Sequence, residues 1–180
     1  MAHDPHLAFR VHSTTPAGCR GVTLELDGRL EAQPGQFVMV WLPRVNEKPF
    51  SLVDGDPVTL SVVQVGPFSE RMQRLQAGDA LYLRGPFGRG FSLESERPLL
   101  VGGGCGAAPL AFLARRLAEA GCRPTVVLGA RTAAELMLSE RFERLGAVVH
   151  LSTDDGSVGE QGLVTAPALR LLRAGHHDRV

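Results

Sequence analysis

Several residue types are scarce in this sequence of 180 residues. It has three cysteines, one Trp, one Tyr and a single lysine, Lys48, beside 18 arginines. The cysteines are odd in number, widely spaced and without a Cys-x-x-Cys pair, which argues against a disulfide framework and against a zinc site. We attribute the preference for Arg over Lys to the base composition of the genome. The single lysine, Lys48, is therefore conspicuous.

An excess of charge of one sign is also absent, because 19 Lys and Arg balance 19 Asp and Glu. Nucleic acids and anionic lipids need a basic surface, so we expect neither as a partner. No apolar run approaches the roughly 20 residues of a membrane helix, and the first residues lack a signal-peptide pattern, so we expect a cytoplasmic protein. The histidines show no spacing suited to a metal, and no metal ligand is predicted among His3, His6, His12, His150, His176 and His177.

Short apolar runs of β type fill the first half of the chain, and turns rich in Gly and Pro separate them. This rhythm favours a small barrel or sandwich. One stretch, Ser69 to Leu75, has helical spacing and predicts a short helix with Ser69 as its N-cap. The predicted strands are Leu7 to His12, Gly21 to Leu26, Gln36 to Leu42, Phe50 to Val53, Val58 to Val65 and Ala80 to Arg84.

After Arg97-Pro98, strands and helices alternate, which predicts a parallel sheet covered on both faces. The predicted strands are Leu99 to Val101, Thr125 to Leu128 and Val148 to Leu151, and the predicted helices are Leu110 to Ala118, Ala133 to Leu145 and Ala166 to Ala174. We therefore expect an antiparallel β-barrel over residues 1–95 and a doubly wound parallel α/β domain over residues 96–180. Gly175 is a plausible helix C-cap, and the residues after it predict a further strand, so the second domain is expected to be truncated in this sequence.

The turn from Gly102 to Leu110 gives the strongest sequence evidence for a ligand-binding site. A buried strand meets glycines that let backbone N–H groups approach an anion at the start of a helix, so a phosphate-bearing ligand is expected. A tight turn without a ligand is the alternative. The acidic residue that a dinucleotide fingerprint places about 20 residues on is missing, and Arg131 follows the second strand instead. Arg131 could face a 2′-phosphate, but pairing with Glu135 one turn later is the preferred interpretation.

Three further segments are candidate ligand-binding sites. Ser152 to Ser157 follows the third strand, at the edge where open α/β sheets bind ligands, although its composition also suits any turn. The segment from Lys48 to Ser51 offers a cation, an aromatic ring and a hydroxyl to a phosphate or flavin. The alternative is an edge strand in which Lys and Pro prevent pairing with another strand. Gly66 to Ser69 precedes the short helix, where the Ser69 hydroxyl and nearby amides form an anion site or an ordinary cap.

Taken in order, these segments resemble the ferredoxin reductase superfamily, and most closely the electron-transfer subunit of class B dihydroorotate dehydrogenases. The motifs that match are Lys48 to Ser51, Gly66 to Ser69, Gly85 to Phe91, Gly102 to Leu110 and Thr153 to Ser157 with Gly159 and Val164-Thr165. The resemblance implies an FAD-binding barrel, an NAD(P)-binding α/β domain, and electron transfer between NAD(H) and a catalytic FMN dihydroorotate dehydrogenase subunit in a hetero-oligomer of pyrimidine biosynthesis.

The resemblance also assigns residues, none of which acts as a general acid or base. For FAD it implies Lys48, Pro49, Phe50, Ser51, Ser61, Val62, Val63, Gly66, Phe68 and Ser69. For the nicotinamide cofactor it implies Gly103, Gly104, Gly106, Ala107 and Pro109, together with Asp154 and Asp155.

The sequence departs from the family at three places. Lys48 replaces an Arg and loses the planar fork that holds a phosphate in a bidentate way. Pro67 and Phe68 replace smaller residues, and Pro67 removes an N–H group. The family continues beyond the position of Val180 into cysteines that bind a [2Fe-2S] cluster, so no cluster is predicted for Cys19, Cys105 and Cys122.

Two other functions stay open. The first is the small subunit of an NAD(P)H-dependent ferredoxin or sulfide oxidoreductase, which shares these motifs. The second is a non-catalytic module that binds a nucleotide without reducing anything.

Overall fold

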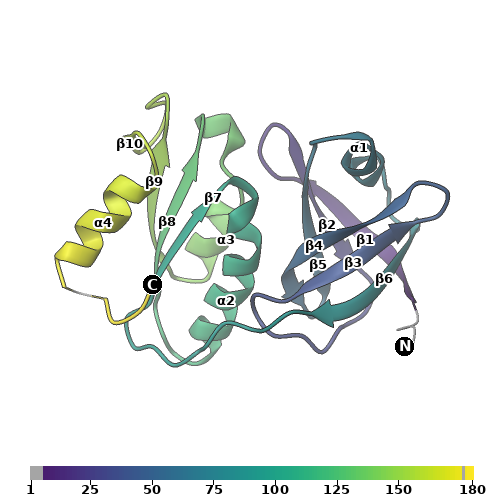
Figure 1. The fold of residues 1–180 in the computed structure, drawn as a ribbon, viewed down its shortest axis with the longest axis horizontal. Helices are drawn as coiled ribbons and strands as arrows, with labels where there is room; N and C mark the ends of the chain where they lie inside the picture. The colour runs from purple at the N-terminus through teal and green to yellow at the C-terminus, as the bar shows by residue number, and fades with distance from the viewer. Residues whose placement is uncertain (1–5, 176) are drawn as a thin grey trace. The chain divides into compact units, whose positions relative to one another are not determined.

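The computed structural model describes residues 6–175 and 177–180. The chain forms two compact units, Met1–Phe91 and Ser92–Val180 (Figure 1). His3, His176 and the first residues, for which neither metal binding nor a signal peptide was predicted, lie outside the described part. None of the helices in that part is long and apolar enough to span a bilayer.

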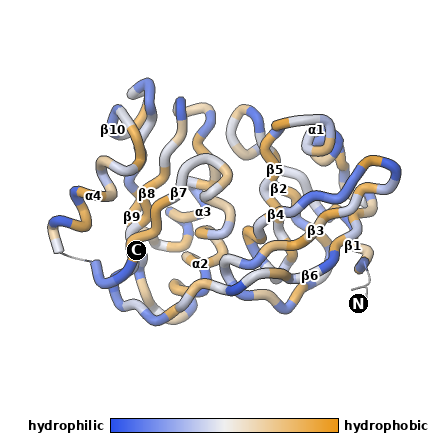
Figure 2. Tube along the Cα trace, viewed as in Figure 1, coloured by the Kyte–Doolittle hydropathy of each residue, from blue (hydrophilic) through white to orange (hydrophobic). Residues whose placement is uncertain are grey.

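The first unit is a closed six-stranded barrel, as predicted, with neighbouring strands antiparallel in the order β1-β2-β5-β4-β3-β6. Alternate side chains point inward, and Leu24, Val38, Val40 and Leu60 are fully buried. Along the trace, β3 is largely hydrophobic, whereas the first part of β4 is hydrophilic (Figure 2). The strands are β1 (Leu7–Pro16), β2 (Gly21–Leu26), β3 (Phe37–Leu42), β4 (Asn46–Gly55), β5 (Val58–Val63) and β6 (Ala80–Phe87).

Strand β4 changes its partners half-way along its length. It pairs with β3 over residues 46–51, and it pairs with β5 only between Leu52 and Gly55. Beyond Leu60, β5 continues in register with β2 alone. The two strands therefore part beside Lys48 to Ser51, which opens the barrel wall at that place.

Helix α1 (Pro67–Gln73) follows β5 and begins two residues before the predicted start. The expected N-cap at Ser69 is wrong, because Gly66 is the N-cap and Ser69 occupies the third helical position. Pro67 suits the first helical position, where an N–H group has no intrahelical partner. The helix therefore starts at Pro67, and the Ser69 hydroxyl reaches back toward the turn.

The second unit contains a four-stranded parallel sheet of order β10-β9-β8-β7. Helices α2 and α3 contact each other on one face, and α4 packs through Ala168 and Leu171 against Leu99 and Val127 on the other (Figure 1). This confirms the doubly wound arrangement. The elements are β7 (Leu99–Gly103), α2 (Ala107–Glu119), β8 (Thr125–Ala130), α3 (Ser139–Arg144), β9 (Val148–Thr153), β10 (Glu160–Gln161) and α4 (Thr165–Arg173).

The predicted helix from Ala133 to Leu145 is wrong as a single element. A short 3₁₀ turn, η2 (Ala133–Glu135), is separated from α3 by residues 136–138, and Leu138 has φ of 61°. The break turns Met137 into the interior, where it is 4% exposed. Burial of one large side chain has therefore overridden a helical pattern.

The C-cap of helix α4 lies one residue before Gly175, the predicted C-cap. Ala174 is the C-cap of α4, and Gly175 takes the next position with φ of 71°, a backbone conformation that favours glycine. Arg179 then forms a parallel bridge with Pro98, and its carbonyl accepts a hydrogen bond of 2.9 Å from the N–H of Leu99. Arg179 thus lies beside the start of β7.

Candidate functional site

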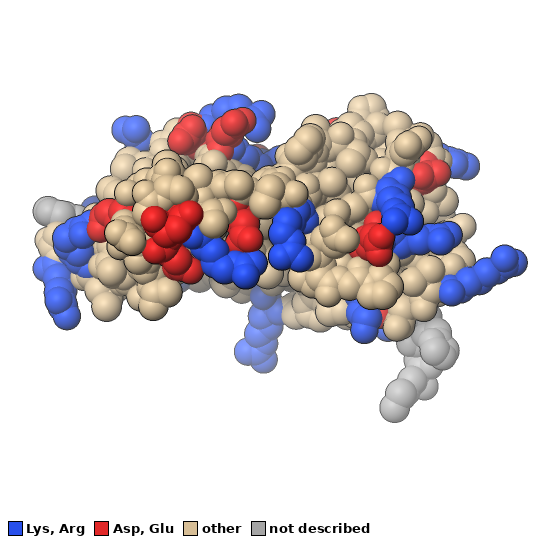
Figure 3. Space-filling view, turned by 90° about the horizontal axis from the view of Figure 1, so that it is seen from above, with Lys and Arg blue, Asp and Glu red and all other residues tan. Residues whose placement is uncertain are grey.

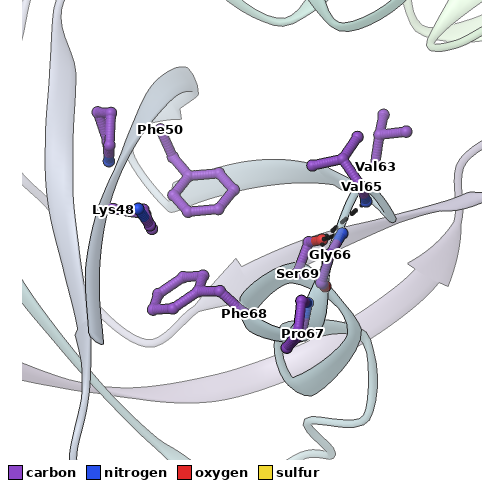
Figure 4. A pocket seen from close by; sticks show the side chains of 9 residues that line it. Lys48, Phe50, Val63, Val65, Gly66, Pro67, Phe68 and Ser69 are labelled. Atoms are coloured by element: carbon purple, nitrogen blue, oxygen red, sulfur yellow. Dashed lines mark hydrogen bonds between the residues drawn. The ribbon is translucent and has the colours of Figure 1, made fainter. Parts of the chain in front are cut away.

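A cavity of about 390 Å³ opens in the barrel unit where β4 and β5 part (Figure 4). Seven residues that the resemblance assigned to FAD line it, together with two that were not assigned, Val65 and Pro67. Val65 is 86% exposed, and no sequence pattern marked it, because an isolated valine at the end of a strand is unremarkable. The lining consists of Lys48, Pro49, Phe50, Val63, Val65, Gly66, Pro67, Phe68 and Ser69.

Two aromatic rings form the apolar part of this cavity. Phe50 comes from β4 and Phe68 from α1, and their ring centroids are 6.0 Å apart with an angle of 27° between the planes (Figure 4). Phe68 is buried, and Phe50 is half-buried. Such a pair offers flat, apolar surfaces to a ring system.

Lys48 supplies a cation to the lining of the same cavity. Its neighbour Glu47 is engaged elsewhere, because the Glu47 carboxylate accepts hydrogen bonds from Arg84 Nε and Nη2 at 2.6 and 2.7 Å, and lies 3.0 Å from His6 Nε2. The Arg84 bonds lower the pKa of Glu47 to about 2, so this carboxylate stays charged and bound to Arg84. Within residues 6–175 and 177–180, no carboxylate pairs with Lys48, which leaves its charge available to an anion.

The turn before α1 is held by the Ser69 hydroxyl. Ser69 Oγ accepts hydrogen bonds from the N–H groups of Val65 and Gly66 at 2.8 and 3.1 Å, and donates one to the Gly66 carbonyl at 2.9 Å. The hydroxyl is therefore occupied within the turn. The N–H groups of Phe68 and Ser69, in the first turn of α1, have no intrahelical partner and are the groups that remain for an anion.

Three predicted FAD residues do not line the cavity. Val62 is buried inside the barrel, and Ser51 is half-buried one position beyond Phe50. Ser61 shares a face of β5 with Val63, and its Oγ is buried without a hydrogen-bond partner in the described part of the chain. An unpaired buried hydroxyl is costly, so Ser61 is the one of the three that calls for a partner.

The second candidate site is the glycine-rich turn of the α/β unit. Strand β7 ends at Gly103, residues 104–106 form a 3₁₀ turn, and α2 begins at Ala107 with Gly106 as N-cap and no side-chain cap. Ala107 is 2% exposed, and its N–H donates to the carbonyls of Gly104 and Cys105, so this predicted residue is occupied within the turn. Pro109 lies in the first turn of α2, where its missing N–H group costs nothing.

The glycines of this turn differ in what requires the absence of a side chain at each position. A Cβ at Gly102 would lie 2.8 Å from Leu110 Cδ1, so Gly102 serves the packing of α2 on the sheet. Gly104 has φ of 52°, which favours glycine. Gly106 has ordinary helical angles, and a Cβ there would meet nothing within 4 Å. Neither conformation nor packing within the protein requires a glycine at position 106, which is consistent with a ligand that approaches the backbone.

Asp154 and Asp155 lie two strands away at the same edge of the sheet. Gly103 is in register with Gly129 of β8, and Ala130 is in register with Thr153 of β9. At about 4.8 Å per strand, the two segments are about 10 Å apart, which a dinucleotide can span. Asp155 accepts hydrogen bonds from the hydroxyl and N–H of Ser157, which lower its pKa.

The cysteines do not form a cluster site. Cys19 and Cys105 are exposed, Cys122 is partly buried, and all three have free thiols. No group of three His, Cys, Asp or Glu side chains converges on a possible metal position in the described residues. The residues present do not fit a [2Fe-2S] cluster.

Charges of both signs lie side by side on the surface seen in Figure 3, without an extended area of one sign. This distribution agrees with the zero net charge of the chain. The predicted absence of a nucleic-acid or membrane partner stays a prediction.

No family model matches the chain. Two curated relatives named probable dihydroorotate dehydrogenase B (NAD(+)), electron transfer subunit, are similar to most of it. The protein from Methanothermobacter thermautotrophicus is 46% identical over 156 residues, 84% of this chain and 58% of the relative. The protein from Methanocaldococcus jannaschii is 37% identical over 158 residues, 88% of this chain and 60% of the relative. The chain thus spans about three fifths of the length of these relatives.

Solved structures share the fold. The NADH-dependent reduced ferredoxin–NADP oxidoreductase, described for flavin-based electron bifurcation, has a TM-score of 0.81 and 30% identity, covering 92% of this chain and 63% of that one. The FAD/NAD-binding domain of a nitric oxide dioxygenase from Vibrio cholerae has a TM-score of 0.77 and 19% identity, covering 99% of both chains, and supports the fold alone. The chain is therefore a homologue of the dihydroorotate dehydrogenase B electron transfer subunits over most of its length, and it has the fold of ferredoxin reductase-like FAD/NAD-binding proteins.

Proposed function

We propose that this chain is the electron-transfer part of an FAD-dependent NAD(P)H oxidoreductase. In this proposal, residues 1–95 bind FAD, residues 96–180 bind NAD(H), and electrons pass to a catalytic partner subunit of the FMN dihydroorotate dehydrogenase type. The observation that carries the proposal is the cavity between β4 and β5, where a cation and two aromatic rings meet at an opening in the barrel wall.

Several groups at the barrel cavity suit parts of FAD, which supports this proposal. The unpaired Lys48 ammonium and the N–H groups of Phe68 and Ser69 suit a pyrophosphate, and Phe50 and Phe68 suit a planar ring. The orphaned Ser61 hydroxyl lies on the same strand as the lining residue Val63 and offers a further hydrogen bond. A volume of about 390 Å³ is in the usual range for ligand pockets, so it holds a part of the cofactor while the remainder lies along the surface.

The glycine turn suits the pyrophosphate of NAD(H). Gly103, Gly104 and Gly106 present backbone without side chains, and the start of α2 adds a partial positive charge. Asp154 and Asp155 are placed at the sheet edge, where they can accept hydrogen bonds from ribose or amide groups.

When bound, FAD would accept a hydride from NADH and release single electrons, and this is chemistry that the cofactor carries. The protein residues bind, orient and exclude water. Phe50 and Phe68 provide a dry apolar surface, and Lys48 neutralises phosphate charge. No step is assigned to an iron–sulfur cluster, because the cysteines present do not fit one.

A second candidate is the small subunit of an NAD(P)H-dependent ferredoxin oxidoreductase. The 30% identity and TM-score of 0.81 to a ferredoxin–NADP oxidoreductase favour it. The two candidates differ in the electron acceptor and share both cofactor sites. Reduction by NADH of ferredoxin, compared with reduction of an FMN dihydroorotate dehydrogenase subunit, separates them.

Flavin absorption tests the shared part of the proposal. The purified protein, supplied with FAD and freed of excess, should show the visible bands of bound flavin, and these should bleach with NADH in the absence of oxygen. Lys48→Glu should weaken FAD binding at least tenfold, because it replaces an attractive charge at the phosphates by a repulsive one.

Arg29→Glu is the matched control, because Arg29 is an exposed cation outside the cavity lining, and this change should leave FAD affinity unaltered. Lys48→Arg should retain binding. A wild-type protein that holds no flavin after incubation would contradict the proposal and favour a module that binds nucleotide without reducing anything.

A further inference from the structure

Arg131 is the first residue after β8, at the edge of the sheet where ribose groups bind in folds of this kind. A free guanidinium at this place suits the 2′-phosphate of NADP(H), whereas an acidic residue suits the 2′-hydroxyl of NAD(H). The strand carries no acid at its end, so the sequence pattern alone does not decide between the two.

The structure brings an acid to Arg131 from the next turn. Arg131 Nε lies 2.9 Å from Glu135 Oε2, and Arg131 Nη2 lies 3.0 Å from Glu135 Oε1. This is a bidentate pair, in which one side of the guanidinium fork is filled by a carboxylate. The Arg131 side chain is nevertheless 68% exposed, so a ligand can reach it.

Hydrogen bonds to the neighbouring loop hold this turn in place. The N–H of Asp155 donates to the Arg131 carbonyl at 3.2 Å, and the N–H of Ala133 donates to Ser157 Oγ at 2.7 Å. Ser157 Oγ in turn donates to Asp155 Oδ1 at 2.6 Å. The same bonds tie the backbone of the Asp154–Asp155 turn to the Arg131 turn, while the Glu135 carboxylate contacts the guanidinium itself.

We propose that Glu135 sets the discrimination against a 2′-phosphate, by occupying the Arg131 guanidinium that would otherwise bind it. Glu135 is thus a positioning residue, which acts through Arg131. A phosphate dianion would have to displace the Glu135 carboxylate from the guanidinium, whereas a 2′-hydroxyl does not compete for it. The inference rests on the proposed NAD(H) site and names the residue that selects the cofactor there.

The test uses two probes that differ only in the 2′-phosphate, 5′-AMP and 2′,5′-ADP, with equilibrium binding measured by calorimetry and NADH binding measured in parallel. In Glu135→Gln, the affinity for 2′,5′-ADP should rise about tenfold relative to that for 5′-AMP, because the carboxylate that competes with the phosphate for Arg131 is gone. The gain should shrink as salt is added, as expected for an exposed charge contact. Glu135→Asp, which keeps the charge, should stay within about threefold of the wild type.

Two further variants make the test specific. The double variant Arg131→Gln/Glu135→Gln should lose the gain, because the cation that receives the phosphate is gone. Glu119→Gln removes the carboxylate of another pair with i,i+4 spacing, Arg115–Glu119 in the last turn of α2, and should leave the ratio of affinities unchanged.

The outcomes separate the two levels of the argument. If the wild-type protein binds NADH but Glu135→Gln leaves the ratio unchanged, or the double variant keeps the gain, the role of Glu135 is wrong. If the wild-type protein binds neither NADH nor 5′-AMP, the proposed function fails at its NAD(H) site.

Discussion

The two candidate sites of this chain are built in different ways. The barrel site consists mainly of side chains, contributed by β4, β5 and the start of α1, around a cavity that exists because two strands part. The site in the α/β unit consists mainly of backbone, where three of the four residues from Gly103 to Gly106 are glycine. A side-chain site depends on which elements meet, whereas a backbone site depends on a local turn, and substitutions should affect the two accordingly.

The largest expected effect concerns the backbone site. Gly106→Val should reduce NADH affinity by about a hundredfold, because a branched side chain would fill the space in which a phosphate approaches the backbone. The melting temperature should change little, since a Cβ at Gly106 meets no protein atom within 4 Å. Calorimetric titration with NADH and a thermal melt measure the two quantities.

Gly102→Ala is the matched control in the same turn. Its Cβ would lie 2.8 Å from Leu110 Cδ1, so it should lower stability by about 1–3 kcal/mol through overpacking while the NADH affinity of the folded protein is retained. If Gly102→Ala and Gly106→Val lost NADH affinity equally, any change in the turn would impair binding. The assignment of Gly106 to ligand approach and of Gly102 to packing would then be wrong.

An intermediate effect is expected in the barrel site. Ser69→Ala should lower the free energy of unfolding by about 1–3 kcal/mol, because it leaves the N–H groups of Val65 and Gly66 without their acceptor. FAD binding should weaken as well, since these residues line the cavity. Denaturation by urea, with and without FAD, measures both effects.

Ser92→Ala is a suitable comparison, because the Ser92 hydroxyl accepts one hydrogen bond from an exposed N–H group, that of Glu94. It should cost well under 1 kcal/mol and leave FAD affinity intact. If Ser69→Ala were equally mild, the hydroxyl would not be what holds the turn.

The smallest expected effect is the loss of stability at low pH, to which one carboxylate contributes in each unit. The pKa of Glu47 falls from 4.5 to about 2 because Arg84 binds its carboxylate, and the pKa of Asp178 falls from 3.8 to about 2 because Ser95 Oγ and the N–H groups of Glu96 and Arg97 donate to it. Both folded values lie below the unfolded ones. The stabilisation is therefore fully present above pH of about 5 and is lost as the pH falls toward 2.

Single substitutions assign this loss to a unit. Glu47→Gln should flatten the acid dependence of barrel unfolding, followed by Trp41 fluorescence, and Asp178→Asn should leave that signal unaltered. The reverse assignment, in which Asp178→Asn flattens the Trp41 signal, would contradict this account of the two carboxylates.

Much of the fold could be read from local patterns. The run from Gly21 to Leu26 is β2 as predicted, and the stripe of Leu110, Leu113 and Leu117 lies in α2. The preferred pairing of Arg131 with Glu135 is confirmed, because the two residues are close in sequence and on the same turn. The failures at Ser69 and at residues 136–138 arose where a proline start and a buried methionine outweighed local preferences.

The sequence by itself determined the order of a β unit and an α/β unit, and it marked the glycine turn, because hydrophobic period, glycine spacing and caps act over a few residues. Only the tertiary structure decided that β4 and β5 part beside Lys48, that Glu47 is held by Arg84 away from the cavity, and that a Cβ would clash with Leu110 at Gly102 but meet no protein atom within 4 Å at Gly106. These features depend on which strands become neighbours, and strand pairing joins residues that lie far apart along the chain.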